Sequence, residues 1–333
     1  MFAGWLLSCL LLAAPEAMPA VQDQSASIPT ARMILVIGAP GEETYAEQFA
    51  AWAEKWEQAA AKGGATLAVI GREDGGPADR DRLQAAVVEA AKSAPRELWI
   101  VLIGHGTFDR RTAKFNLRGP DVAASDLKTW LADVKSPTAI IDCSAASAPF
   151  LQTLAGPNRI VISATKSGGE QNFARFGEYL SQAIADPAAD LDKDDQTSLW
   201  ESYLAASRKT DEFYKTDGRL QTEHPLLDDN GDGQGTRSDA FRGLEPVQDA
   251  DDGKSALDGV KAHQWHLVPS AAESKLPVDI RRRRDDIELQ ILMLRTQKTQ
   301  LSEDEYYDRL EALVVELSRL SQGTKTPSDS AQR

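Results

Sequence analysis

The stretch that decides the fold runs from Leu98 to Phe150 and holds two apolar runs. The first reads Leu98-Trp-Ile-Val-Leu-Ile103 and is followed by Gly104-His105-Gly106, whereas the second reads Thr138-Ala-Ile-Ile141 and is followed by Asp142-Cys143-Ser144. Continuous apolar runs with β-branched residues are typical of strands that are buried on both faces. The roughly thirty residues between them suit a right-handed crossover, so the two strands should be parallel.

This pairing has a consequence for His105 and Cys143. Neighbouring parallel strands lie about 4.8 Å apart, and each of these residues follows its strand directly or after one glycine. Open α/β sheets place their ligand sites at the carboxyl ends of the strands. The sequence therefore predicts that an imidazole and a thiol, a base and a nucleophile, project from one edge of the sheet.

The segments around this stretch alternate between strand and helix patterns. Helices are indicated by apolar residues at three- and four-residue spacing, as in Phe49, Trp52 and Trp56. Such alternation predicts an α/β fold with a mainly parallel sheet that is covered on both faces. The further predicted strands are 32–38, 65–70 and 159–163, with a late strand at 263–269, the predicted helices are 45–61, 79–93, 125–132, 173–185 and 198–214, and 107–121 is predicted as a polar loop.

Composition and the amino terminus set the class of protein. The 333 residues are 42% hydrophobic, enough for one sizeable core with an appendage, and the net charge of −14 argues against a nucleic-acid partner. Residues 1–20 contain an apolar run too short to span a membrane and then small residues, a pattern typical of a signal peptide. We therefore expect an exported protein without a membrane span. Removal of this segment would leave Cys143 as the only cysteine, so no internal disulfide is expected.

Two acidic loops have the ligand spacing of calcium-binding loops. Alternate oxygens and a carboxylate at the twelfth position converge on one ion in the EF-hand, where position six is a glycine. In the first loop, 190–201, Asp195 replaces that glycine and should strain the turn. Surface turns rich in Asp and Asn are the alternative interpretation of both loops. The candidate Ca²⁺ ligands are Asp190, Asp192, Asp194, Ser198 and Glu201 in the first loop, and Asp228, Asn230, Asp232 and Asp239 in the second, 228–239.

The carboxyl-terminal part changes character. Residues 245–254 are predicted to be a mobile acidic loop, and residues 277–322 show two helical patterns. The second of these opens with a capping box at Ser302 and carries apolar residues alternately four and three apart, which predicts an antiparallel helical hairpin. The hairpin could pack on the α/β domain, 31–270, or form a homodimer, and the sequence leaves both open. A disordered tail is expected over 323–333.

The residues that end the two central strands resemble the caspase–legumain–gingipain clan of cysteine peptidases. That clan has an apolar strand that ends in His-Gly and a later apolar strand that ends in Cys, here Leu102-Ile-Gly-His105-Gly106 and Ile140-Ile-Asp-Cys143. The small residues after Cys143 resemble the legumain branch most. The resemblance covers roughly residues 32–267 and implies a three-layer caspase-like fold.

The resemblance also implies a reaction. Cys143 would attack a peptide carbonyl to form a thioester, His105 would protonate the departing amine, and backbone N–H groups of Gly106 and Cys143 would hold the oxyanion. Residues around Ser163, Thr165 and Lys166 would shape the substrate pocket. The implied partner is a peptide or protein substrate, and no organic cofactor is implied. Asp142 departs from the clan, and a neighbouring carboxylate raises a thiol pKa.

A second interpretation belongs to a different functional class. Bacterial proteins of this type often lack the cysteine, so the chain could be a catalytically inactive, calcium-binding scaffold or interaction protein of the same fold. Other enzyme classes fit worse, because the chain lacks the papain-like order of Cys and His, a Gly-x-Ser-x-Gly turn and a nucleotide-binding glycine fingerprint. The isolated His263 and His266 do not form a zinc motif.

Overall fold

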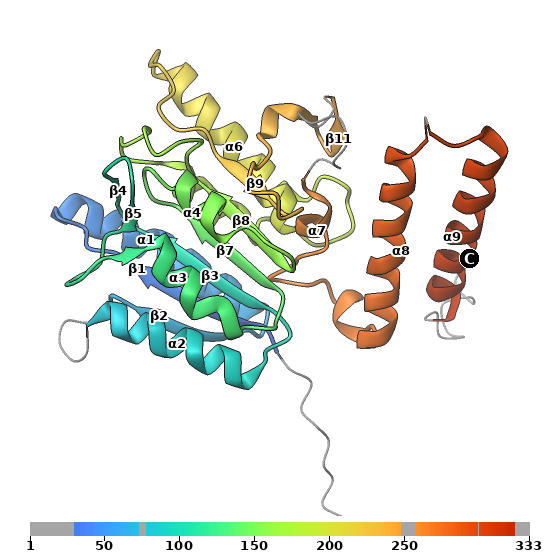
Figure 1. Cartoon of the computed structure of the whole chain (residues 1–333), viewed down its shortest axis with the longest axis horizontal. Coiled ribbons are helices and arrows are strands. Elements are labelled where there is room, and N and C mark those ends of the chain that lie inside the picture. The colour runs from blue at the N-terminus through green and yellow to red at the C-terminus, as the bar shows by residue number, and fades with distance from the viewer. Residues whose placement is uncertain (1–29, 73–77, 248–257, 299, 324–333) are drawn as a thin grey trace, which may run out of the picture.

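The computed structural model describes residues 30–72, 78–247, 258–298 and 300–323, and its centre is a six-stranded sheet with the strand order β2-β1-β3-β7-β8-β9 (Figure 1). The first five strands of this order are parallel to their neighbours, and β9 runs antiparallel to β8. The strands are β1 (Arg32–Ile37), β2 (Thr66–Ile70), β3 (Leu98–Ile103), β7 (Thr138–Asp142), β8 (Arg159–Ser163) and β9 (Leu226–Asp228).

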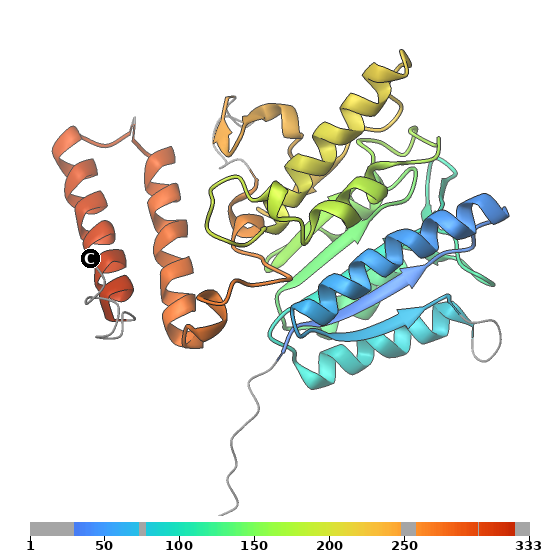
Figure 2. The ribbon, with the colours of Figure 1, turned by 180° about the vertical axis from the view of Figure 1, so that it is seen from behind.

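Helices cover both faces of the sheet and make a three-layer molecule (Figures 1 and 2). One face packs against α1 (Glu43–Lys62), α5 (Phe176–Ala183) and α6 (Leu199–Thr216), through residues such as Trp56, Leu180 and Tyr203. The other face packs against α2 (Asp79–Ser93), α3 (Ala124–Trp130) and α4 (Ala148–Leu154). Successive strand residues point to opposite faces, so each apolar run supplies both cores. The predicted α/β fold with a mainly parallel sheet is confirmed.

The two last helices form a hairpin beside this body. These are α8 (Val278–Thr296) and α9 (Glu303–Gly323), and α8 lies between α9 and the sheet domain in both views (Figures 1 and 2). The side chains of Ile287, Leu294 and Tyr306 are buried, as the apolar spacing predicts for a helix pair. The predicted hairpin is confirmed, whereas its pairing with a second copy stays a prediction.

Two local predictions are wrong. Part of the predicted polar loop 107–121 belongs to a small antiparallel sheet of β4 (Gly106–Phe108), β5 (Ala113–Phe115) and β6 (Val122–Ala123), because Phe115 and Val122 alternate with polar residues and are buried. The predicted late strand 263–269 has no ladder partner. Its first residue instead ends the short helix α7 (Val260–His263), and Trp265 and Leu267 join the core beside α1 and α6.

The remaining elements are short. They are the 3₁₀ helices η1 (Leu131–Asp133), η2 (Pro187–Ala189), η3 (Ser238–Ala240) and η4 (Glu273–Lys275), and the paired strands β10 (Phe241–Arg242) and β11 (Glu245–Pro246). The predicted signal peptide, residues 324–333 of the predicted tail, and residues 248–254 of the predicted mobile loop lie outside the described residues. None of the described helices is long and apolar enough to cross a membrane.

Candidate functional site around Cys143 and His105

The sheet brings Cys143 and His105 to the same edge and the same face. Leu102 of β3 is level with Asp142 of β7, so the two residues that follow these strands leave the sheet side by side. Cys143 belongs to the core beneath α1 and α5, and the ring of His105 lies against Phe49 of α1. The topology therefore matches the arrangement that the two sequence motifs predict.

The thiol of Cys143 is covered by the helix layer. Only 1% of the residue is exposed, and the backbone of α5 passes so close at Gly177 that a Cβ there would lie 2.6 Å from Cys143 Cβ and 3.1 Å from its Sγ. The same Cβ would meet the ring of Trp52 at 3.0 Å. Burial, with smaller contributions from Asp142 and Glu223, strongly raises the pKa of the Cys143 thiol. A thiol in this environment is neutral and inert.

His105 is held by other partners. Its Nε2 lies 3.1 Å from the carbonyl oxygen of Pro40, and a carbonyl only accepts, so Nε2 carries the proton. Aromatic rings surround the imidazole, with centroid distances of 4.7 Å to Tyr45 and 5.9 Å to Phe173. Within the described residues, no hydrogen bond joins either imidazole nitrogen to Cys143 Sγ.

The two proposed oxyanion donors have local roles. The N–H of Cys143 donates to the carbonyl oxygen of Leu102 at 2.9 Å and extends the β3–β7 ladder. At Gly106, a Cβ would lie 2.2 Å from the carbonyl oxygen of Ala145 and 2.6 Å from Ser144 Oγ. The turn after the cysteine therefore occupies the space beside Gly106, and this close approach is what requires the glycine.

Asp142 lies on the opposite face of β7 from Cys143 and is fully buried. Its Oδ1 accepts hydrogen bonds from the N–H and the hydroxyl of Ser144, at 2.9 and 2.6 Å, and its Oδ2 has no partner among the described residues. Burial raises the pKa of Asp142 to about 6, against the opposing effect of the Ser144 bonds. This carboxyl group organises the turn that follows the nucleophile position.

The candidate pocket residues after β8 divide into two kinds. Ser163 Oγ donates to the carbonyl of Thr165 at 2.9 Å. Thr165 Oγ1 accepts from the N–H of Ala148 at 3.2 Å and so satisfies the start of α4. Both side chains are fully buried, whereas Lys166 is exposed. In this conformation Ser163 and Thr165 hold the edge of the sheet together, and only Lys166 faces solvent.

Two carboxylates near this edge, the buried Glu223 and the partly buried Glu170, were missed by the sequence reasoning. Glu223 accepts three hydrogen bonds, from the N–H groups of Arg175 and Phe176 at 2.9 Å and from the hydroxyl of Tyr214 at 3.1 Å. It satisfies the amino-terminal N–H groups of α5, which explains why this helix begins at Phe176 and not at the predicted 173. Glu170 pairs with the Nδ1 atom of His224 at 2.5 Å. The polar Glu223-His224 pair directly before an apolar run was the available signal.

The first acidic loop brings three of its five predicted ligands together. Asp190, Asp192 and Asp194 each offer a carboxylate oxygen, and these oxygens lie within 4.8 Å of one another. Ca²⁺ binds oxygens at 2.3–2.6 Å, so ligands around one ion lie at most about 5 Å apart. Ser198 and Glu201 instead form the capping box that opens α6. Asp195 has a φ of +69°, the strained conformation expected where the usual glycine is missing.

The second loop repeats the backbone of the first. The carboxylate at position one accepts the N–H groups of positions four and six in both loops, Lys193 and Asp195 on Asp190, and Gly231 and Gly233 on Asp228. These four donors all have a positive φ. Burial, with the charge of Asp258 next, raises the pKa of Asp228 to about 6. The second loop thus has the same backbone hydrogen bonds as the first, around a buried carboxylate at position one in each.

The predicted twelfth residue of the second loop is displaced by a distant one. Asp239 is exposed and pairs with Arg237 at 2.7 Å. Asp258 accepts the N–H groups of loop positions two and three, Asp229 and Asn230, at 2.8 and 3.0 Å. Glu201 accepts the same two positions of the first loop. Asp258 therefore occupies the place assigned to Asp239, which spacing within the loop could not reveal.

Comparison with known proteins returns structures only. No protein-family model and no curated protein matches the sequence. Among solved structures, the fold is similar to the Drosophila initiator caspase Dronc, with 14% identity and a TM-score of 0.41, over 69% of this chain and 95% of that one. It is also similar to caspase-1 from Spodoptera frugiperda, with 8% identity and a TM-score of 0.40, over 60% and 86%. Likenesses this remote assign neither an activity nor a residue role.

Proposed function

We propose that the chain is a catalytically silent scaffold with a peptidase-like fold, in which Cys143 is a packing residue. The observation that carries this proposal is the burial of the thiol, because only 1% of Cys143 is exposed and the backbone of α5 at Gly177 lies close to Sγ. A cysteine nucleophile must be accessible to the substrate, and its thiol must ionise to the thiolate. Burial raises the pKa of this thiol, and His105 is engaged by Pro40.

The second candidate is a legumain-like cysteine endopeptidase that uses the Cys143–His105 dyad. It is favoured by the emergence of both residues from neighbouring strands on one face of the sheet. In that reaction Sγ bonds to the peptide carbonyl carbon, the C–N bond breaks, His105 protonates the leaving amine, and water then hydrolyses the thioester. This candidate requires α5 to move away from Cys143.

Thiol labelling separates the two candidates. Iodoacetamide is added to the folded full chain at pH 7.5, with and without Ca²⁺, and to the same chain in denaturant. A scaffold gives no labelling of Cys143 until the chain unfolds, whereas the exposed control Lys166→Cys is labelled at once. Rapid labelling of folded Cys143 that is slowed in His105→Ala, together with cleavage of a peptide library, would overturn the scaffold proposal and establish the peptidase.

We also propose that the acidic loops bind Ca²⁺. The mutual spacing of the Asp190, Asp192 and Asp194 oxygens fits one ion, and the second loop has the same pattern of backbone donors. A ligand that binds only the folded state stabilises it. The melting temperature should therefore rise on addition of Ca²⁺ and fall back with a chelator. An unchanged melting temperature together with no heat of binding in calorimetry would contradict the proposal. The proposed export would place the chain outside the cytosol, and extracellular proteins use Ca²⁺ sites of low affinity.

A further inference from the structure

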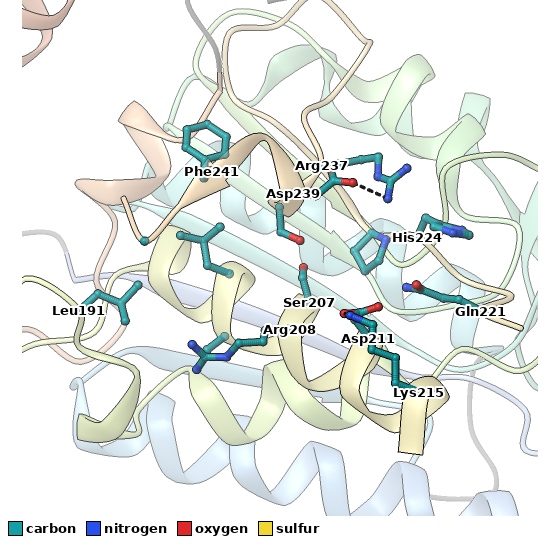
Figure 3. A pocket seen from close by; sticks show the side chains of 15 residues that line it. Leu191, Ser207, Arg208, Asp211, Lys215, Gln221, His224, Arg237, Asp239 and Phe241 are labelled. Atoms are coloured by element: carbon teal, nitrogen blue, oxygen red, sulfur yellow. Dashed lines mark hydrogen bonds and ion pairs between the residues drawn. The ribbon is translucent and has the colours of Figure 1, made fainter. Parts of the chain in front are cut away.

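A cavity of about 450 Å³ lies between α6, the segment that precedes β9, and the turn from η3 to β10 (Figure 3). Neither Cys143 nor His105 lines it. Its two ends differ in chemistry. One end is lined by the apolar side chains of Leu191 and Phe241, and the other by polar and basic side chains that include Gln221, His224 and Arg237 (Figure 3).

The imidazole of His224 is fixed in place at the polar end. Its Nδ1 pairs with Glu170 Oε1 at 2.5 Å, and its backbone N–H donates to Oε2 of the same carboxylate at 3.1 Å. Glu170 is itself held by the N–H of Lys166 at 2.9 Å. Because the two ring nitrogens lie on opposite sides of the imidazole, Nε2 is turned away from Glu170. No described residue hydrogen-bonds to it. Because Nδ1 donates to Glu170, Nε2 donates to an anionic ligand only in the doubly protonated ring, whereas in the neutral ring it accepts.

A second polar group in the wall lacks a partner. Ser207 is 4% exposed, its Oγ has no hydrogen-bond partner among the described residues, and it lines the cavity. Figure 3 shows its hydroxyl pointing into the space beside His224. A buried hydroxyl without a hydrogen bond costs free energy that a bound acceptor or donor would recover.

The charge in the cavity favours an anion although the whole chain carries −14. Three cationic side chains, Arg208, Lys215 and Arg237, and two carboxylates, Asp211 and Asp239, line the cavity. Lys215 pairs with Asp211 at 2.5 Å and Arg208 with Glu212 at 3.9 Å, so Arg237 is the cation on which the proposed site depends. Asp239 occupies one nitrogen of Arg237, Nη2, at 2.7 Å. A guanidinium has five N–H donors in a fork that matches a carboxylate, so donors remain for a ligand.

We propose that this cavity binds a small organic carboxylate with an apolar body. The carboxylate lies at the end formed by Arg237, His224 and the Ser207 hydroxyl, and the apolar body lies against Phe241 and Leu191. Nothing covalent is involved. The proposal is independent of whether Cys143 is catalytic, because neither Cys143 nor His105 lines the cavity.

Calorimetric titration of the full chain tests the proposal with two matched pairs of probes, hexanoate against hexanol and 4-phenylbutyrate against 4-phenylbutanol. At least one acid should bind, and its alcohol should bind about tenfold more weakly or worse, since a hydrogen bond to a charged group contributes about 1.5–3 kcal/mol. Failure of both acids to bind, or equal binding of acid and alcohol, would overturn the proposal.

Variants locate the binding. Arg237→Gln should weaken the acid about tenfold, and Asp239→Asn, which frees the same guanidinium, should strengthen it. Arg219→Gln is the matched control, because it removes an equal charge from the other described cavity, where Arg219 pairs with Asp217. Circular dichroism confirms that each variant is folded. Unchanged affinity in both Arg237→Gln and Asp239→Asn would show that the acid binds elsewhere and would reject this site.

Discussion

At the scale of single residues, the turn after β7 depends on two groups that have no role in the proposed Cys143–His105 reaction. Asp142 fixes Ser144 from one face of the strand, and Gly177 admits Cys143 on the other. Both groups are buried, so each one couples the candidate nucleophile to the core. Because the core is closely packed, adding or removing even one methyl group at such a position disturbs the neighbouring side chains.

Asp142 should impose a pH dependence on stability. Its pKa is about 6 in the folded chain against 3.8 ordinarily, so the folded state binds the extra proton between these values. The free energy of unfolding should therefore fall as the pH rises from about 4 to 6, by about 3 kcal/mol from this group. Asp142→Asn should flatten the profile in that range, measured by urea unfolding at a series of pH values.

Asp109 offers a control with the opposite sign for that experiment. Hydrogen bonds from the N–H groups of Thr112 and Arg111 lower its pKa, so it stabilises the fold above its ordinary pKa and loses this effect as the pH falls. Asp109→Asn should consequently shift the profile slightly in the other direction. A profile that is identical in Asp142→Asn and the parent chain would refute the role assigned to Asp142.

Gly177→Ala should destabilise the chain although alanine is the better helix former. The new Cβ would overlap Cys143 and Trp52, and overpacking costs about 1–3 kcal/mol, more than the roughly 1 kcal/mol gained in helix propensity. The midpoint of urea unfolding should fall, and Cys143 should become easier to label. Gly156→Ala, whose Cβ would meet nothing within 4 Å, should leave both unchanged, and equal stability of the two variants would argue against a close cover over Cys143.

At the scale of elements, the two acidic loops are built alike but closed differently. The first takes its closing carboxylate, Glu201, from the helix that follows it, and the second takes Asp258 from beyond β11. The second loop therefore ties β9 to the start of α7, since Asp229 also accepts the N–H groups of Gly259 and Ala262. Burial, with the charge of Asp258 next, raises the pKa of Asp229 to about 7.

Substitution of each carboxylate in turn should show whether Asp258 or Asp239 closes the second loop around Ca²⁺. Asp258→Asn should abolish the Ca²⁺ affinity of the second loop and reduce the number of ions bound per chain by one, measured by calorimetry against the parent chain. Asp239→Asn should bind the same number of ions as the parent chain, because Asp239 pairs with Arg237 at the surface. The reverse result would restore Asp239 as the twelfth ligand.

At the scale of the whole molecule, ion pairs tie the segment that leaves the sheet domain, η4, to the first helix of the hairpin. Glu273 of η4 is 6% exposed and forms ion pairs with Arg281 at 2.9 Å and with both terminal nitrogens of Arg284, at 2.6 and 3.0 Å. Although burial acts to raise it, the bonds and charge of Arg284 and Arg281 lower the pKa of Glu273. This residue holds η4 against α8.

Loss of the Glu273 carboxylate should loosen the hairpin without unfolding the sheet. Removal of one partner of a buried ion pair costs about 3–5 kcal/mol, so Glu273→Gln should make residues 277–323 the first site of limited proteolysis. Glu305→Gln removes an exposed pair with Arg309, worth about 0.3–0.5 kcal/mol, and is the matched control. Identical digestion of both variants would show that other contacts hold the hairpin.

The sequence by itself determined the main parallel strands, most of the helices and the order in which they alternate, although it missed β4 to β6 and β9 and wrongly predicted a strand at 263–269. The continuous apolar runs of β3 and β7, the spacing of Phe49, Trp52 and Trp56, and the capping box at Ser302 are local patterns, and each one formed the predicted kind of element. Even the strain at Asp195 was visible, because the missing glycine is a property of one position. The placement of His105 and Cys143 at one edge follows from the parallel pairing of two adjacent strands.

Only the tertiary structure decided what surrounds these residues. Three contacts join segments up to 65 residues apart. Gly177 packs over Cys143, His105 bonds to Pro40, and Asp258 closes the second acidic loop in the place predicted for Asp239. A local sequence pattern carries no information about these tertiary contacts, because they depend on how whole helices and loops pack on the sheet. Burial then sets the pKa of a thiol or a carboxyl group, and burial is a property of the folded chain alone.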